Sequence, residues 1–337
     1  MCIRDSYYVE RVGERRITFA EAIAAVEPTL AEGQRITGIT LSSDEERTWK
    51  VNLSTPKHGA VYIDQYSGKV LGSPERLPFF RTMFRMHRWL MDTRPEDGGI
   101  YWGKVIVGVS TLFLVVILLS GIILWIPKSV AMWKNRSRIA VTRGWKRFLY
   151  DLHVAGGIYV SFIVLAMALT GLTWSFKWYR NGAYALLGAD GKVATAQQSA
   201  PRSKDTTYDS ANVAYETVVA QYDCYNDATV TPSSVSVKLS GFGNPRAADK
   251  YHFDTSGAIT AVELYDDAPR QRKVGGWIYA IHVGSFGGYV TRVLWFLAAL
   301  FAASLPVTGY YLWIKRRFMN RCKKSSCDGC LSNLNKE

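Results

Sequence analysis

VIVGVSTLFLVVILLSGIILWIP occupies residues 105–127 and contains no charged side chain. Two stretches of the same character follow it, LHVAGGIYVSFIVLAMALTGLTWSF at 152–176 and VLWFLAALFAASLPVTGYYLWI at 293–314. At 1.5 Å of rise per residue, each stretch is long enough to cross about 30 Å of hydrocarbon as a helix. A core helix of a soluble protein normally keeps a polar stripe, which these stretches lack. The sequence therefore predicts three transmembrane helices.

The composition of the chain excludes several other classes of protein. Hydrophobic residues make up 48% of the 337 residues, which is too many for a disordered chain. Five cysteines are too few for a disulfide scaffold. The formal charge of +13 would suit a nucleic-acid-binding protein, so the position of the charge decides between that class and a membrane protein.

Most of the excess charge lies beside the apolar stretches. Residues 127–151 hold seven basic and one acidic side chain, and residues 315–337 hold seven and two. In residues 1–102 and 177–287 the basic and acidic residues balance. Short basic loops stay on the cytoplasmic side of a membrane, which explains the net charge without nucleic acid. We expect residues 127–151 and 315–337 to be cytoplasmic, and the two balanced segments to be periplasmic.

This topology requires residues 1–102 to be translocated, yet the start of the chain, MCIRDSYYVERVGERR, is polar. We therefore expect a further transmembrane helix to precede it in the complete protein. We expect residues 1–14 to be an artefactual start of the sequence, and we assign them to no module.

The two periplasmic segments carry the same order of patterns. Thr18 and Glu21 form a capping box before a helix that ends near Pro28, and alternating strand patterns follow up to a Ser67-Gly68 turn. In the second segment a helix at 210–222 precedes strand patterns at 233–241, 248–257 and 258–266. Each segment is expected to be a small α+β module, a helix followed by an antiparallel meander.

The expected fold class is thus an α-helical membrane protein with three spans, a fourth N-terminal span missing, and two small α+β periplasmic modules. The expected segments are a first module at 15–75, an amphipathic segment at 76–102, a span at 103–127, a basic loop at 128–151, a span at 152–176, a linker at 177–207, a second module with the His282 segment at 208–287, a span at 288–314 and a tail at 315–337.

Recurring motifs support a parallel repeat. Span one ends in Ser120-Gly121 followed by Leu-Trp-Ile at 124–126, and span three ends in Thr308-Gly309 followed by Leu-Trp-Ile at 312–314. Together with HVAGGIY at 153–159, RMHRWL at 85–90 and IHVGSFGG at 281–288, these motifs resemble the PepSY-associated transmembrane proteins, often called iron-regulated membrane proteins. The resemblance implies four helices, two periplasmic PepSY modules and b-type haem bound by histidines. The family includes ferrisiderophore reductases of the bacterial inner membrane.

Three histidines are the candidate haem ligands. His153 lies inside a span, where an ionisable group is a functional candidate by default, although an interfacial imidazole reaching for water is the alternative. His87 and His282 precede spans one and three, and each could instead be a surface or turn residue. Arg85 and Arg88 flank His87 and could lie near haem propionates. His58 and His252 fall in strand or turn patterns, which favours a structural role.

The repeat also predicts how the ligands pair. His87 and His282 occupy corresponding places on the periplasmic side, so we expect them to bind one haem together. His153 lies a membrane thickness away and is expected to bind a second haem, with its partner on the missing helix.

Two functions follow from these features. The first is a transmembrane electron conduit with two b-type haems, which takes electrons from a cytoplasmic donor and reduces a ferric siderophore or other iron chelate. The alternative is a non-redox sensor or binding protein for a peptide, peptidase or metal chelate, anchored in the lipid bilayer. A permease is disfavoured because the spans carry no acidic or basic residue to line a path. Cys322, Cys327 and Cys330 could bind a metal, take part in redox contacts or be idle.

Overall fold

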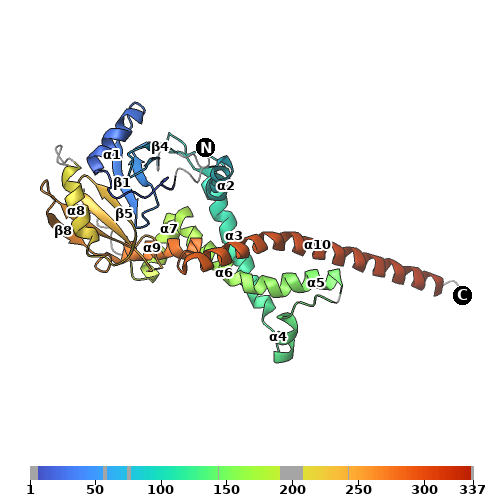
Figure 1. Ribbon diagram of the computed structural model, residues 1–337. Coiled ribbons are helices and arrows are strands. Elements are labelled where there is room, and N and C mark those ends of the chain that lie inside the picture. The colour runs from blue at the N-terminus through green and yellow to red at the C-terminus, as the bar shows by residue number, and fades with distance from the viewer. Residues whose placement is uncertain are drawn as a thin grey trace. The chain divides into compact units, whose positions relative to one another are not determined.

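The computed structural model describes residues 7–55, 59–73, 77–142, 144–189, 208–241 and 243–334, without the side chains of Asn135 and of residues 318–334. The chain separates into two compact units (Figure 1). We call Met1–Met91 with Asn181–Ala280 the sheet unit, and Asp92–Arg180 with Ile281–Glu337 the helical unit.

In the described part of the chain, the sheet unit contains one eight-stranded antiparallel sheet in the order β4-β3-β2-β1-β5-β6-β7-β8. Its strands are β1 (Ile36–Ser42), β2 (Trp49–Leu53), β3 (Ala60–Ile63), β4 (Val70–Gly72), β5 (Tyr225–Thr231), β6 (Ser234–Leu239), β7 (Ala248–Phe253) and β8 (Ile259–Glu263). The helices that precede each group of strands are α1 (Phe19–Val26), extended by the 3-10 turn η2 (Glu27–Thr29), and α8 (Asp209–Val219). Helix and four-stranded meander thus occur twice in the same order.

The expected fold class, an α-helical membrane protein of three spans with two small α+β modules, is wrong. The two meanders share one sheet because β1 pairs with β5, with Ile39 opposite Val230 and Leu41 opposite Ala228. The hydroxyls of Thr40 and Thr229 lie 2.9 Å apart across this junction. An edge strand leaves backbone N–H and C=O groups without hydrogen-bond partners. Pairing of β1 with β5 provides partners for these groups on both strands. The described chain is an α+β protein that combines a large antiparallel sheet with three apolar helices.

The core of the sheet unit draws on both meanders. Phe19 of α1 is buried against Tyr215 of α8, with the ring centres 5.6 Å apart, and its backbone N–H donates to the side-chain oxygen of Asn212. Val51 and Val237, from opposite halves of the sheet, are fully buried in the same hydrophobic cluster. A shared core of this kind makes the two halves one folding unit.

Local features of the sheet unit follow the sequence closely. The capping box of Thr18 and Glu21 is confirmed, since each side chain accepts a hydrogen bond from the backbone N–H of the other residue. The turn at Gly257 has a positive φ of 86°, and the Asp254 carboxylate accepts hydrogen bonds from the backbone N–H and the hydroxyl of Ser256. These hydrogen bonds lower the pKa of the Asp254 carboxyl. Gly68 supplies the same left-handed conformation in the first meander.

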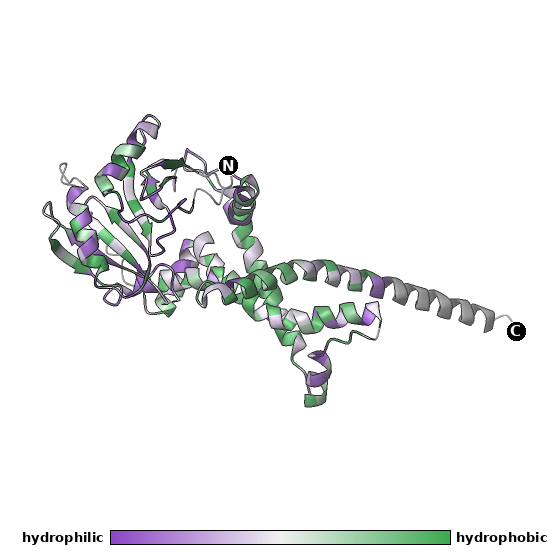
Figure 2. Cartoon of the chain, viewed as in Figure 1, coloured by the Kyte–Doolittle hydropathy of each residue, from purple (hydrophilic) through white to green (hydrophobic). Residues whose placement is uncertain are grey.

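In the described residues, three helices are long and apolar enough to cross a membrane: Trp102–Trp125, Trp145–Ser175 and Gly288–Arg317. The first is α3 (Trp102–Trp125). The second is a continuous run of α5 (Trp145–Asp151), a π-helical turn η3 (Leu152–Gly156) and α6 (Gly157–Ser175). The third is the first part of α10 (Gly288–Leu334). Figure 2 shows hydrophobic residues along α3, α6 and the adjoining part of α10.

The span that contains α6 is the most buried of these helices, and α6 packs against both α3 and α10. Small residues make the close approach possible. A Cβ on Gly108 of α3 would lie 2.6 Å from the ring of Phe176, and one on Gly156 would lie 2.5 Å from the ring of Phe301 on α10.

The remaining helices are α2 (Pro78–Trp89), α4 (Val130–Arg136), α7 (Lys177–Leu186) and α9 (Arg270–Val283). Helix α7 occupies the first ten residues of the predicted linker at 177–207, and residues 190–207 lie outside the described part of the chain.

Candidate functional site

The imidazole of His282 lies at the end of α9 and contacts α6. Its Nδ1 is 3.0 Å from the backbone oxygen of Met167 and 3.1 Å from the hydroxyl oxygen of Thr170. The ring of Trp174, one turn further along α6, meets the imidazole edge-on with the ring centres 5.0 Å apart. His282 is therefore held in one orientation by a single face of α6.

The hydrogen-bond partners decide which ring nitrogen of His282 carries the proton. A backbone carbonyl can only accept, so Nδ1 must donate to Met167. The hydroxyl of Thr170 donates to carbonyls of its own helix, at 2.6 Å from Ala166 and 3.0 Å from Met167, and so offers Nδ1 a lone pair. The neutral imidazole then has its proton on Nδ1 and its lone pair on Nε2.

His153 is held in the same way at the other end of α6. It lies in the π-helical turn η3, and its Nδ1 is 2.9 Å from the hydroxyl oxygen of Thr308 on α10. The Thr308 hydroxyl donates to the carbonyls of Ser304 and Leu305, at 3.3 and 3.1 Å. When it donates to either carbonyl it accepts from Nδ1, and the lone pair of a neutral His153 imidazole is then on Nε2. Single π-helical turns inside α-helices often occur at functional sites.

A glycine next to each threonine lets the imidazole approach the neighbouring helix. A Cβ on Gly171 would lie 3.2 Å from Cε1 of His282, and a Cβ on Gly309 would lie 3.0 Å from Cε1 of His153. Both distances are shorter than ordinary van der Waals contact, so an alanine at either position would push the ring away. In each site, therefore, a histidine packs against a Thr-Gly pair of a neighbouring span.

The two sites lie at opposite ends of the central helix. His153 and Thr170 are 17 residues apart in sequence, which corresponds to roughly 25 Å of helix. The imidazoles cannot share one small ligand. In each imidazole a hydrogen bond holds Nδ1, as in many metal-binding histidines, where one ring nitrogen is hydrogen-bonded and the other binds the metal.

His87 belongs to the sheet unit, on α2. It is exposed, and its spacing places it on one helix face with Phe80, Met83 and Phe84. His282 belongs to the helical unit, so the pairing of His87 with His282 stays a prediction.

The two arginines that flank His87 are held locally. Arg85 donates to the backbone oxygen of Met91 at 3.0 Å, and the guanidinium of Arg88 lies 5.0 Å from the ring centre of Trp89. Their expected role near haem propionates stays a prediction.

Of the other residues singled out from the sequence, His252 is described and does not belong to these two sites. Nε2 of His252 lies 3.0 Å from the carboxylate of Glu263 on the neighbouring strand, as suits a structural residue. His58 lies outside the described residues, as do the side chains of Cys322, Cys327 and Cys330. Within the described residues, no group of three or more His, Cys, Asp or Glu side chains could hold a metal ion.

Sequence reasoning did not identify Thr170, Gly171, Thr308 and Gly309 as contacts of the histidines. A signal was present, because each span contains a small hydroxyl residue followed by glycine: Ser120-Gly121, Thr170-Gly171 and Thr308-Gly309. The pair in α6 is harder to recognise in the sequence, because no Leu-Trp-Ile sequence follows it.

Comparison with known proteins adds one match. A family model described as the PepSY-associated TM region matches residues 4–316, which is most of the chain. Among the curated proteins, none matches this sequence.

Proposed function

The chain belongs to the PepSY-associated transmembrane family, and we propose that it is a haem-containing electron-transfer protein of the bacterial inner membrane. In this proposal it reduces a ferric siderophore or another Fe(III) chelate on the periplasmic side, for iron acquisition. Family membership and the three apolar helices among the described residues make it a membrane protein. The haem, the substrate and the orientation are the proposed part.

The observation that carries the proposal is the matched pair of imidazoles at the two ends of α6. His153 and His282 would each offer Nε2 to a haem iron, and His87 would be the second ligand on the His282 side. The residues present fit this cofactor because imidazole with a fixed Nδ1 proton is a good iron ligand. When bound, b-type haem supplies a one-electron Fe(III)/Fe(II) couple.

The chain's own residues set the conditions for electron transfer. Thr308 and Thr170 contact Nδ1 of His153 and His282, and so hold both imidazoles in one orientation. The apolar side chains of the spans keep water and protons away from the interior. Because His153 and His282 lie at opposite ends of one helix, haems held by them would lie near opposite membrane surfaces and could pass an electron from the His153 side to the His282 side.

Reduction of the substrate consumes one electron per iron, supplied by a cytoplasmic reductant. Fe(III) in an oxygen-rich chelate becomes Fe(II), which is a softer ion that hard oxygen ligands hold less tightly. The iron can then dissociate from its chelator without breakage of a covalent bond in the chelator.

The positions of the basic residues support the orientation. Residues 127–151 and 315–337 would face the cytoplasm, which places His153 near the cytoplasmic surface and His282 near the periplasmic one. A reporter fused after Glu337 should be active only as a cytoplasmic fusion.

An absorption spectrum of the purified full-length protein, oxidised and then reduced with dithionite, tests the proposal. We expect the bands of low-spin b-type haem, and reduction of an external ferric chelate by proteoliposomes that contain an internal reductant. A haem-free protein that is expressed in a haem-replete host and keeps its fold would overturn the proposal and favour a non-redox PepSY sensor.

A further inference from the structure

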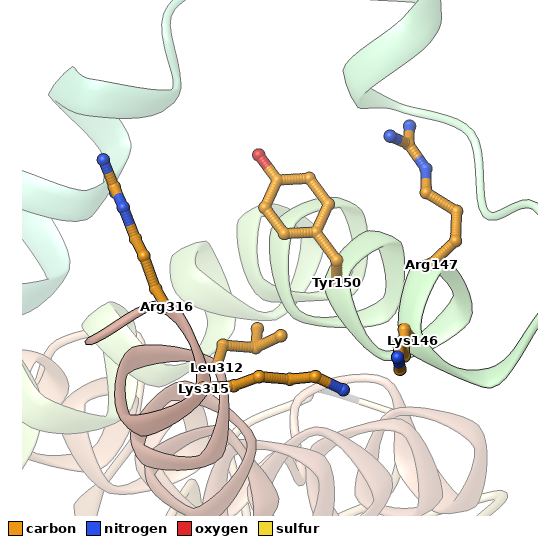
Figure 3. A pocket seen from close by; sticks show the side chains of 6 residues that line it. All are labelled: Lys146, Arg147, Tyr150, Leu312, Lys315 and Arg316. Carbon is orange, nitrogen blue, oxygen red and sulfur yellow. The ribbon is translucent and has the colours of Figure 1, made fainter. Parts of the chain in front are cut away.

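A basic pocket lies between α5 and α10 (Figure 3). Along the chain, α5 leads into the turn that carries His153, so the pocket lies at the same end of α6 as the contact between His153 and Thr308. It has a volume of about 370 Å³ and is open to the outside. The side chains that line it are Lys146, Arg147, Tyr150, Leu312, Lys315 and Arg316. Figure 3 shows Lys315 extending across the pocket toward Lys146, with Leu312 beside it.

The charges in the pocket are not balanced. Arg147 is paired with Asp151 at 2.9 Å, and Asp151 also accepts from the backbone N–H of Ala140. Lys315 donates to the hydroxyl of Tyr311, which is neutral. Among the described residues, no acidic side chain pairs with Lys146, Lys315 or Arg316. The pocket therefore has a positive charge that an anion would neutralise.

The place of the pocket along the helices indicates which anion would reach it. Lys146 and Tyr150 lie in the first turns of the candidate span Trp145–Ser175, and Lys315 and Arg316 lie in the last turn of the candidate span Gly288–Arg317. The ends of membrane spans lie at the depth of the lipid headgroups.

The walls of the pocket match both parts of a phospholipid. The ammonium and guanidinium groups suit a phosphate, and Leu312 with the ring of Tyr150 suits the first carbons of an acyl chain. Basic pockets between spans commonly bind lipid headgroups.

We propose that this pocket binds the phosphate of an anionic phospholipid, such as phosphatidylglycerol or cardiolipin. Lys146 and Lys315, on facing helices, contact the phosphate, and Arg316 adds charge at the rim. The inference goes beyond the proposed electron transfer, since it requires only that these helix ends lie at the membrane surface.

Native mass spectrometry of the full chain, released from nanodiscs that contain phosphatidylcholine with or without phosphatidylglycerol, tests the proposal. We expect phosphatidylglycerol to remain bound to the wild type, and the double variant K146Q/K315Q to bind it at least about tenfold more weakly. The double variant K134Q/R138Q removes the same number of positive charges from the basic loop at 128–151 outside the pocket, and should bind as the wild type does. K146R/K315R should keep the binding.

Equal losses in K146Q/K315Q and K134Q/R138Q would mean general attraction to a basic surface, and would overturn the pocket proposal. Inorganic pyrophosphate provides the test of the phosphate source. If millimolar pyrophosphate displaces phosphatidylglycerol from the wild type, and binds equally well to detergent-solubilised protein without lipid, the pocket is a site for soluble phosphates instead. Thermal unfolding of each variant checks that the fold is kept.

Discussion

At both ends of α6 a histidine contacts a threonine hydroxyl through Nδ1, but the two imidazoles differ in the number of contacts that hold them. His153 has the Thr308 hydroxyl as its Nδ1 partner, whereas His282 has the Thr170 hydroxyl and also the backbone oxygen of Met167. His282 also meets the ring of Trp174.

The difference follows from where each imidazole comes from. His153 lies on the central span itself and reaches outward to α10, while His282 approaches from α9 and docks onto α6. A backbone carbonyl cannot be removed by substitution, so the orientation of His282 depends less on any one side chain. We infer that the His153 site is the more easily perturbed of the two.

Substitution of the histidine ligands themselves should have the largest effect on haem content. His153→Ala should remove about half of the haem of the full-length protein, and His282→Ala the other half, because the two sites lie too far apart to share a cofactor. His87→Ala should affect the same half as His282→Ala if those two residues pair. Pyridine haemochrome assays measure the stoichiometry.

His252→Ala is the matched control for these variants, because His252 lies in the sheet and contacts Glu263. It should keep all of the haem. If His153→Ala and His282→Ala each retain the full complement, neither residue is a ligand, and the two-site comparison fails.

Substitution of the two glycines by alanine should have the next largest effect on haem content, and the effect should differ between the two sites. Gly309→Ala puts a methyl group 3.0 Å from Cε1 of His153, and Gly171→Ala puts one 3.2 Å from Cε1 of His282. Overpacking of this kind costs about 1–3 kcal/mol. We expect Gly309→Ala to lower haem occupancy at the His153 site more than Gly171→Ala does at the other, as judged by haem content and thermal unfolding.

Gly121→Ala separates this effect from a general effect of alanine in a span. Gly121 belongs to the Ser-Gly pair of α3, and a Cβ there meets nothing within 4 Å in the described structure. Haem content should be unchanged. Equal losses for all three alanine variants would show that helix propensity or bundle packing, rather than contact with the imidazoles, is responsible.

The sequence predicted those features that depend on neighbouring residues. Runs of uncharged residues located the spans, and Thr18 and Glu21 identified the start of α1. The strand β5 was missed because Asn226 and Asp227 are poor strand formers, and their strand is stabilised by pairing with β1, almost 190 residues earlier. Without β5, the two meanders could not be recognised as one sheet.

Prediction of the two histidine sites from the sequence has the same limit, because their contacts join residues that are distant along the chain. The histidines were found because ionisable residues near spans are rare, but their hydrogen-bond partners lie 112 and 155 residues away in sequence. Contacts between spans depend on how the helices rotate against each other, which a hydrophobic run does not specify. Only the repeated hydroxyl-glycine pair pointed to these contacts.

A smaller effect is expected when the hydroxyls are removed. Thr308→Val leaves Nδ1 of His153 without its described acceptor, so the proton can move to Nε2 and haem affinity at that site should fall by tenfold to a hundredfold, by order of magnitude. Thr170→Val should have less effect, because Met167 still accepts from Nδ1 of His282. Nitrogen-15 NMR of labelled histidine in the haem-free protein reports the tautomer directly.

Thr308→Ser restores the hydroxyl and should restore the tautomer at His153, whereas a loss of packing would not be repaired. If Thr170→Val and Thr308→Val change the tautomers equally, the extra carbonyl at His282 has no effect, and the two sites are equivalent.

The smallest effect should come from Trp174, whose ring meets His282 at an interplanar angle of 70°. Edge-to-face contacts of this kind contribute about 0.5–1.5 kcal/mol, which corresponds to roughly a twofold to twelvefold change in a rate or affinity. Trp174→Leu should speed the loss of haem from the His282 site by that factor and leave the His153 site unchanged. Transfer of haem to apomyoglobin measures both rates, and Trp178→Leu, at an exposed ring outside the site, is the control. A faster loss from both sites would mean that Trp174 supports the bundle as a whole, and the greater rigidity assigned to the His282 site would then rest on Met167 and Thr170 alone.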